Sequence, residues 1–329
     1  MHNKFKGAID GAIGTYLNAA SEEKDNKTKE TLHKTMLKNQ KFAQGAAVEF
    51  GHPNIDFSLA VETALDNITA FELVGYQPME TPRSLIYQLK SVSEDEDKET
   101  KLDSTAFGAL IRLEVVSTPI DASTKKLSTS WNILDVEMEI LRALGKEIAI
   151  EYNQEIITDL GHLANKMAAV IHDDKELNVH IQRAANTIAS KTRRGVGNWI
   201  VVSKNVAKRL KSNIAPTDGK FVDLGDDEAL AKLPDLFKYG ILNGSQYVYV
   251  NKWHMDEHTE GKSSILVGYK GTTDIDTGYI IAPFQLILYS GVVTNPHTFE
   301  PIMSLMTRYG KYSENGKDYY VKIDLEFED

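Results

Sequence analysis

The sequence predicts an α+β protein in which one long helix lies between two regions of β-strand. Three observations support this class. Apolar residues recur at helical spacing over about 134–170. Upstream of them, 85–90 and 109–116 have the composition and alternation of strands. From about residue 220 the period of the apolar residues becomes two, which is typical of half-buried strands.

The N-terminal part is expected to contain an arm followed by a helix. Residues 1–55 are polar and rich in lysine, which indicates a segment that gains order by docking elsewhere. Apolar residues then recur at helical spacing from Phe57 to Ile68, so we expect a helix over 56–70.

The two upstream strands are expected to pair as a long hairpin. In the second strand Ile111, Leu113 and Val115 alternate with Arg112 and Glu114. The connecting segment is too charged to pack, so its tip is expected in solvent. Because a two-stranded ribbon is not independently stable, the hairpin must lie on its own domain or on a neighbour.

The dominant helix has two apolar registers, from Leu134 to Ile148 and from Tyr152 to Val170, with a bend expected at Gly145. A second helix is predicted around Val179 to Ile188. It is expected to end at Gly195 and Gly197, before a buried strand over 199–202 and a short helix over 206–210.

The C-terminal part is expected to consist mostly of strands. Asn243-Gly244 is a favoured two-residue hairpin turn. The last strand alternates strictly from Val321 to Glu328, and we interpret it as a half-buried edge strand with an acidic outer face. The other predicted strands lie at 247–250, 265–267, 279–281 and 286–288.

Composition excludes several classes of function. The chain has 329 residues, a formal charge of −10 and no cysteine, which excludes disulfides, thiolate metal sites and thiol catalysis. The sequence holds no apolar run of membrane-spanning or signal-peptide length, so we expect a cytosolic product. An acidic body does not attract nucleic acid non-specifically. We interpret the N-terminal lysines and Arg193-Arg194 as solvated helix surface.

Two motifs match catalytic patterns but lack the context that the chemistry needs. His254-Met255-Asp256-Glu257-His258 fits an inverted zinc-protease pattern, which requires a helix to bring both histidines to one face. Its flanks here are typical of a strand and a polar loop. Asp276-Thr277-Gly278 matches the aspartic-protease triplet, but that chemistry needs two carboxylates and the chain has one copy. We interpret the triplet as a strand-entry turn.

Gly195-Val196-Gly197 follows a predicted helix and precedes a predicted strand. A phosphate-binding loop needs the order strand, glycines, helix, so we expect a helix end and a chain reversal instead. The sequence predicts no catalytic residue, no cofactor-binding residue and no metal ligand. We therefore expect that the protein is not an enzyme.

Several separated segments, in the same order, resemble the major head protein of T-even-type myophages. The resemblance covers about residues 56–312. No single segment decides it, but so many ordered matches are improbable by chance. The segments are 71–79, 137–160, 192–206, 267–271, 276–284 and 295–310, the last of which contains Thr307-Arg308-Tyr309-Gly310.

The resemblance implies the Hong Kong 97-type phage coat fold, which is an α+β fold. The T-even proteins also carry an insertion domain on the extended loop, which the connection 91–108 is too short to hold. The implied parts are an N-terminal arm at 1–55, a peripheral-domain entry at 56–84, the extended β-hairpin loop at 85–116, a peripheral domain with a long spine helix at 117–175, an axial domain at 176–290, and a C-terminal return with the terminal strand at 291–329.

The implied function is that of a major capsid protein, which self-assembles into hexamers and pentamers. These form the icosahedral head of a tailed bacteriophage around double-stranded DNA, which is enclosed without sequence-specific binding. The implied partners are other copies, neighbouring capsomers, and portal, scaffold and decoration proteins, with no membrane. The implied location is the virion capsid, assembled in the bacterial host cytoplasm. We expect the hairpin 85–116 and the arm 1–55 to lie across adjacent subunits.

Three alternative functions stay open at this point. One is an encapsulin-like compartment shell with protein cargo, against which the Thr-Arg-Tyr-Gly ending argues. Another is a zinc metallohydrolase that uses His254, Glu257 and His258. The third is a soluble adaptor or tail component, which would stay monomeric at high concentration.

Overall fold

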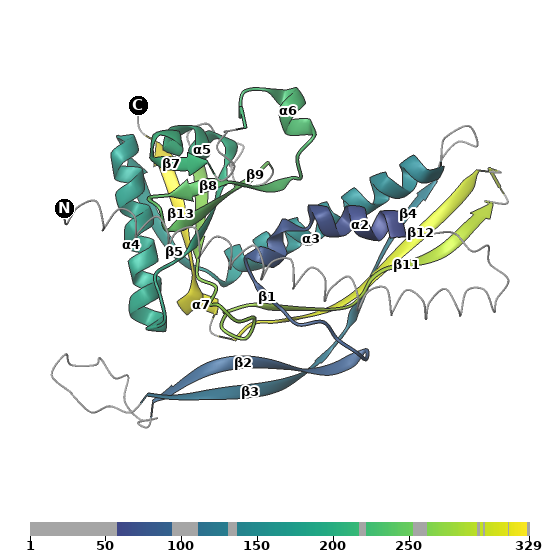
Figure 1. Ribbon diagram of the computed structural model, residues 1–329, viewed down its shortest axis with the longest axis horizontal. Helices are drawn as coiled ribbons and strands as arrows, with labels where there is room; N and C mark the ends of the chain where they lie inside the picture. Colours follow the sequence, from purple (N-terminus) through teal and green to yellow (C-terminus); the bar gives the residue numbers. More distant parts are fainter. Residues whose placement is uncertain are drawn as a thin grey trace, which may run out of the picture.

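The computed structural model describes residues 58–93, 111–130, 137–216, 222–252, 262–294, 297–298, 300–314 and 316–327. Figure 1 shows a compact unit of helices and strands, a long sheet that extends from it beside two helices, and a two-stranded ribbon below. The predicted α+β class is confirmed. The predicted arm 1–55, the hairpin tip and the motif at His254–His258 lie outside the described residues.

The compact unit is built on a seven-stranded mixed sheet. Its strands are β5 (Asn165–Ile171), β6 (Trp199–Ser203), β7 (Ile214–Pro216), β8 (Leu236–Leu242), β9 (Gln246–Asn251), β10 (Lys262–Gly268) and β13 (Tyr320–Phe327), and its helices are α4 (Asp174–Thr192), α5 (Lys204–Leu210), η2 (Lys211–Asn213) and α6 (Asp227–Ala231). The strand order is β5-β13-β10-β6-β9-β8-β7. The predicted helix around Val179–Ile188, the buried strand and the short helix after it are confirmed as α4, β6 and α5.

The terminal strand has two neighbours, so its prediction as an edge strand is wrong. β13 pairs antiparallel with β10 and parallel with β5. The edge position is taken by β5, whose residues the sequence pattern assigned to a helix. The predicted acidic outer face is confirmed, because Asp324 and Glu326 are exposed while Ile323 and Leu325 are buried.

The long helix α3 (Glu137–Leu163) has 27 residues and is about 40 Å long. It continues through Gly145 and ends before Met167 and Val170, so the predicted helical register beyond residue 163 is wrong. From Asn165 onward the backbone pairs with β13, and exposure alternates with the period of a strand. Its buried face is confirmed and comprises Leu144, Ile148, Tyr152, Ile156 and Leu160.

A four-stranded sheet runs alongside α3 (Figure 1). Its order is β1 (Gly75–Tyr76), β11 (Ile280–Thr294), β12 (Pro301–Tyr312) and β4 (Ser123–Ser130). The strands predicted at 279–281 and 286–288 are parts of the single strand β11, whose pairing with β12 contains register shifts. The predicted helix over 56–70 is confirmed as α2 (Ser58–Asn67), which is followed by η1 (Thr69–Glu72).

The predicted hairpin is confirmed as an antiparallel ribbon of β2 (Arg83–Ser93) and β3 (Ile111–Asp121). Its register runs from Arg83 opposite Asp121 to Ser93 opposite Ile111. The short helix α7 (Gly316–Tyr319) lies above this ribbon in Figure 1 and leads into β13.

Candidate assembly surface

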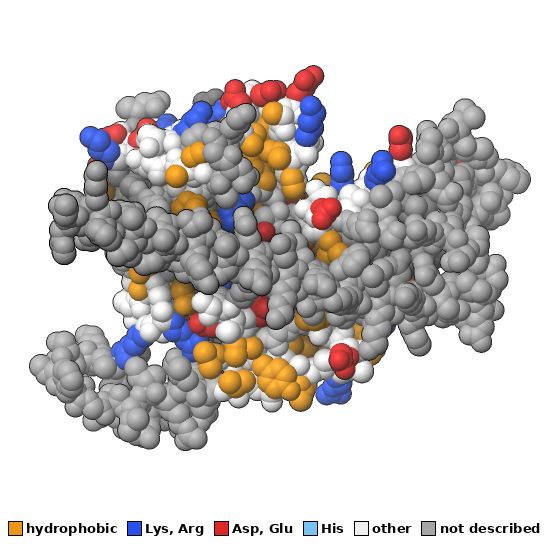
Figure 2. All heavy atoms as spheres, in the orientation of Figure 1, with side chains coloured by type: hydrophobic (Ala, Val, Ile, Leu, Met, Phe, Trp, Pro, Cys, Tyr) orange, Lys and Arg blue, Asp and Glu red, His pale blue; other side chains and the backbone are white. Residues whose placement is uncertain are grey.

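One face of the ribbon presents apolar side chains to solvent. Leu85, Tyr87 and Val115 are 55%, 47% and 57% exposed. Leu85 and Tyr87 are two residues apart on β2, and Val115 lies opposite Leu89 on β3, so the three side chains share one face. Figure 2 shows hydrophobic side chains gathered along this ribbon. We call these three residues the outer ribbon face.

The opposite face of the ribbon packs on the body of its own subunit. Ile86 is 2% exposed and lies in a small core with Met79, Ile120, Ile280 and Ala282. The ribbon is therefore apolar on both faces along its base, and the body of the subunit covers one of them.

The Asp276-Thr277-Gly278 turn holds the base of the ribbon. Gln88 Nε2 donates to the Thr277 carbonyl (2.7 Å), and Thr277 Oγ1 lies 3.1 Å from the Tyr320 hydroxyl. A Cβ on Gly278 would lie 2.7 Å from Tyr319 Cβ, so glycine is needed there for close packing. The interpretation of the triplet as a turn before a strand is confirmed.

Arg194 is buried at this turn, so its prediction as solvated surface is wrong. Its guanidinium forms an ion pair with Asp276, and the two side chains are only 9% and 15% exposed. The partner of the Asp276 carboxylate is thus a cation, whereas an aspartic-protease site needs a second carboxylate. Arg193, the helix C-cap, has a left-handed backbone (φ 54°) and is exposed.

The predicted helix end at the two glycines is confirmed. α4 ends at Thr192, and Gly195 and Gly197 precede β6, so the order is helix, glycines, strand. A Cβ on Gly197 would meet the Ala185 backbone at 3.2 Å, which shows that the reversal packs directly on α4. A phosphate site would require the glycines to lead into a helix N-terminus, but here they lead into a strand.

A polar cluster joins α3 to the four-stranded sheet, and no sequence motif predicted it. Glu155 accepts from Lys311 Nζ (2.6 Å), Lys125 Nζ and the Tyr309 hydroxyl. Lys311 Nζ also donates to Asp159 (2.6 Å). Burial opposes ionisation of Glu155, but the hydrogen bonds from Lys125, Lys311 and Tyr309 outweigh it and lower the pKa of its carboxyl.

A second buried polar group links α3 to β8. Asn153 Nδ2 donates to Asp235 (2.9 Å) and to the Asn67 carbonyl (2.9 Å), while its oxygen accepts from Ala70 N (3.0 Å). Burial raises the pKa of Asp235 above its ordinary value, and the hydrogen bond from Asn153 only partly opposes that rise. Both polar clusters connect α3 to neighbouring elements.

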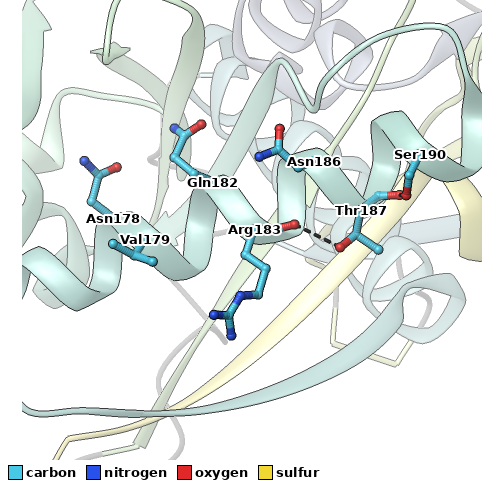
Figure 3. Close-up of a pocket in the computed structure, with 7 residues that line it drawn as sticks. All are labelled: Asn178, Val179, Gln182, Arg183, Asn186, Thr187 and Ser190. Carbon is cyan, nitrogen blue, oxygen red and sulfur yellow. Dashed lines mark hydrogen bonds between the residues drawn. The ribbon is translucent and has the colours of Figure 1, made fainter.

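The described residues contain no group of three or more potential metal ligands. A cavity of about 580 Å³ follows the outer face of α4 (Figure 3). Its lining residues all come from that one helix and offer amides, hydroxyls and one guanidinium, without a carboxylate or histidine. They are Asn178, Val179, Gln182, Arg183, Asn186, Thr187 and Ser190. Within the described part of the chain, no helix is both long enough and apolar enough to span a bilayer.

Among the described residues, three of the six exposed large apolar side chains lie together on the ribbon. A two-stranded ribbon with such a face is typical of a protein that contacts a larger surface. A family model described as "Major capsid protein Gp23" matches residues 107–322, well over half of the chain. The chain belongs to this family of capsid proteins.

Curated relatives agree with the family match. The chain is 26% identical over 237 residues to the major capsid protein of Enterobacteria phage T4, which covers 58% of this chain and 42% of the relative. It is 24% identical over 228 residues to that of Vibrio phage KVP40, covering 58% and 43%. The chain spans less than half the length of these relatives. The resemblance to T-even-type head proteins is confirmed.

Solved structures also resemble the chain at low identity. A virus-like particle from Pyrococcus furiosus is 13% identical with a TM-score of 0.48, covering 81% of this chain and 96% of that one. The structure titled Mycobacterium phage Che8 is 12% identical with a TM-score of 0.46, covering 73% and 84%.

Proposed function

We propose that this chain is the shell subunit of a tailed-phage head, built on the Hong Kong 97-type fold. Copies assemble into hexamers and pentamers that close an icosahedral shell around double-stranded DNA. Membership of the capsid-protein family supports the class of function. The outer ribbon face is the observation that carries the mechanism, because its apolar residues lack a cover within the described part of the subunit.

The contact energy at one ribbon is modest and becomes large through repetition. Burying the exposed half of Leu85, Tyr87 and Val115 is worth about 1 kcal/mol each, from about 1.5–3 kcal/mol for burying a whole apolar side chain. About 3 kcal/mol per ribbon is too little to hold two subunits alone. In a closed ring every subunit both gives and receives the contact, so the shell is stabilised by many such contacts together.

We assign the segments of the chain to the parts of the shell subunit as follows. The arm 1–55 and the ribbon 85–116 contact neighbours, 56–84 leads into a peripheral domain that includes α3 within 117–175, and 291–329 returns to it. We propose that the axial domain at 176–290 holds most strands of the seven-stranded sheet, although 280–290 lies in β11 of the four-stranded sheet. The seven-stranded sheet also takes β5 and β13 from outside this range, so we extend the proposed axial domain to include them.

The charge of the chain suits a container for DNA. A formal charge of −10 disfavours tight binding of the genome over the inner wall, so the DNA is enclosed without sequence-specific contacts. We propose neighbouring capsomers, portal and scaffold proteins and decoration proteins as partners. Assembly takes place in the cytoplasm of the bacterial host, and the final location is the virion capsid.

Negative-stain electron microscopy of the full chain tests this function. We expect closed particles from the wild type and folded, unassembled subunits from Val115→Glu, because the glutamate places a charge in the proposed contact. Val179→Glu on α4 is the matched control, since Val179 is also 57% exposed. Wild-type protein that stays monomeric at high concentration would contradict the proposal. Normal particles from Val115→Glu would show that the outer ribbon face is not needed for assembly.

A further inference from the structure

The free edge of β2 is held over one short stretch by polar groups from outside the ribbon. The Gln77 amide pairs with both peptide groups of Tyr87, because Tyr87 N donates to Gln77 Oε1 (2.9 Å) and Gln77 Nε2 donates to the Tyr87 carbonyl (2.6 Å). The amide thus takes the place that a neighbouring strand would have in a sheet.

Leu89, two residues further along the same edge, is held in a similar way. Its N–H donates to the Ile275 carbonyl (2.9 Å), and its carbonyl accepts from Arg194 Nη2 (3.1 Å). Arg194 also forms the buried ion pair with Asp276. A second ion pair, between Lys270 and Asp274 (3.4 Å), supports the same turn. We call Gln77, Gln88, Arg194 and Asp276 the ribbon-base cluster.

Directional polar contacts define an angle more sharply than apolar contacts do. The apolar core under Ile86 resists separation of the ribbon from the body but tolerates small rotations, because the hydrophobic effect has no directionality. Hydrogen bonds weaken steeply when they bend. Arg194 and Asp276 are also largely shielded from water, which strengthens their attraction relative to an exposed pair.

A small change of geometry at the cluster is amplified along the rest of the ribbon. β2 continues for four residues beyond Leu89, to Ser93, which is about 13 Å at the rise of a strand. A small rotation of β2 about Leu89 therefore moves Ser93 by several times the displacement of the atoms next to Leu89. Val115, in the outer ribbon face, lies directly opposite Leu89. The direction in which that face meets a neighbour therefore depends on the geometry of the cluster.

We propose that the ribbon-base cluster sets the angle of the ribbon against its own subunit and thereby the curvature and size of the shell. Arg194 acts as the main positioning residue, because it joins the ribbon to the turn and reaches the end of α4. This inference rests on the proposed function, since a shell must form before its size can be regulated.

Particle size measured by electron microscopy tests the proposal, with thermal unfolding of the unassembled subunit as a second readout. The variants are Arg194→Met, which removes the ion pair and the bond to Leu89, Arg194→Lys, which keeps the charge without the forked geometry, and Gln77→Met. Arg83→Met is the control, because its ion pair with Asp121 (3.6 Å) is on the same ribbon but about three-quarters exposed.

We expect wild type and Arg83→Met to give one common size class, and Arg194→Met and Gln77→Met to lose it in favour of a spread of sizes and open sheets. Arg194→Lys should restore the single class only in part. Unchanged particles from both variants, with only a lower unfolding temperature, would overturn the positioning role and leave the proposed function intact. If Arg194→Met does not fold, the partly exposed Gln77→Met decides. Wild-type protein without particles would overturn both.

Discussion

The polar cluster on α3 gives a pH-dependent prediction whose size follows from the structure. Glu155 is only 17% exposed on its side chain and accepts from two lysines and a tyrosine. Glu155→Gln removes the charge from both ion pairs and keeps the shape of the side chain. Because the pairs are partly exposed, we expect a loss of about 2 kcal/mol in the free energy of unfolding at pH 7, below the cost of breaking a fully buried pair.

The sign of the pH dependence follows from the lowered pKa of Glu155. A carboxyl whose pKa is lower in the folded state contributes its full stability above the unfolded value of 4.5. That contribution is lost as the pH falls through the lowered folded value. The difference between wild type and Glu155→Gln should therefore begin to shrink as the pH falls below 4.5 and approach zero below the lowered folded value.

Urea unfolding of the unassembled subunit across pH 3 to 7 measures this difference. Glu147→Gln, at an exposed position on the same helix, is the control and should change the unfolding free energy by less than about 0.5 kcal/mol. A difference for Glu155→Gln that is absent at pH 7, or that stays constant down to pH 3, would refute the reasoning about the cluster.

Three further changes test the packing and the second buried carboxylate. Burial raises the pKa of Asp235, so stability falls as the pH rises above the ordinary value of 3.8 and is lowest once the pH exceeds the raised value. Asp235→Asn should therefore raise the unfolding free energy at pH 7 but not at pH 3, and an equal effect at both would count against this. Ile86→Ala should cost about 2–5 kcal/mol in urea unfolding, because the side chain is 2% exposed. Gly278→Ala should cost about 1–3 kcal/mol by overpacking against Tyr319, and a neutral result would show that the turn can relax.

The sequence predicted best those elements whose pattern is local. The alternation of Ile111, Leu113 and Val115 was enough to find β3 and its pairing, because a strand exposes every second residue to the same environment. The buried stripe of α3 from Leu144 to Leu160 was equally visible, because a helix repeats its environment every three or four residues.

The errors arose where tertiary contacts decide the outcome. Met167 and Val170 are three residues apart and so fit a helical period, but parallel pairing with β13 places them in a strand. That same pairing moved β13 from the edge of the sheet to its interior. No local pattern distinguishes the two outcomes, because both leave Ile323 buried and Asp324 exposed.

The candidate site was only half visible in the sequence. A hairpin that cannot be stable alone was predicted, and with it the need for a partner surface. The cluster that positions the ribbon was missed. Arg194 is buried and the adjacent Arg193 is exposed, but two neighbouring arginines cannot be told apart from the local sequence. Only the fold shows that Asp276, far away in the sequence, neutralises one of them.

Thiol labelling tests the central claim most directly, because the chain has no cysteine of its own. Val115→Cys and Val179→Cys each place one thiol at a position that is 57% exposed in the subunit. A thiol-reactive reagent should label both in unassembled protein. In assembled particles we expect the thiol at position 115 to be protected while the thiol at position 179 still reacts. Equal labelling of position 115 in subunits and in particles would show that copies of the chain do not cover the outer ribbon face, and would contradict the account.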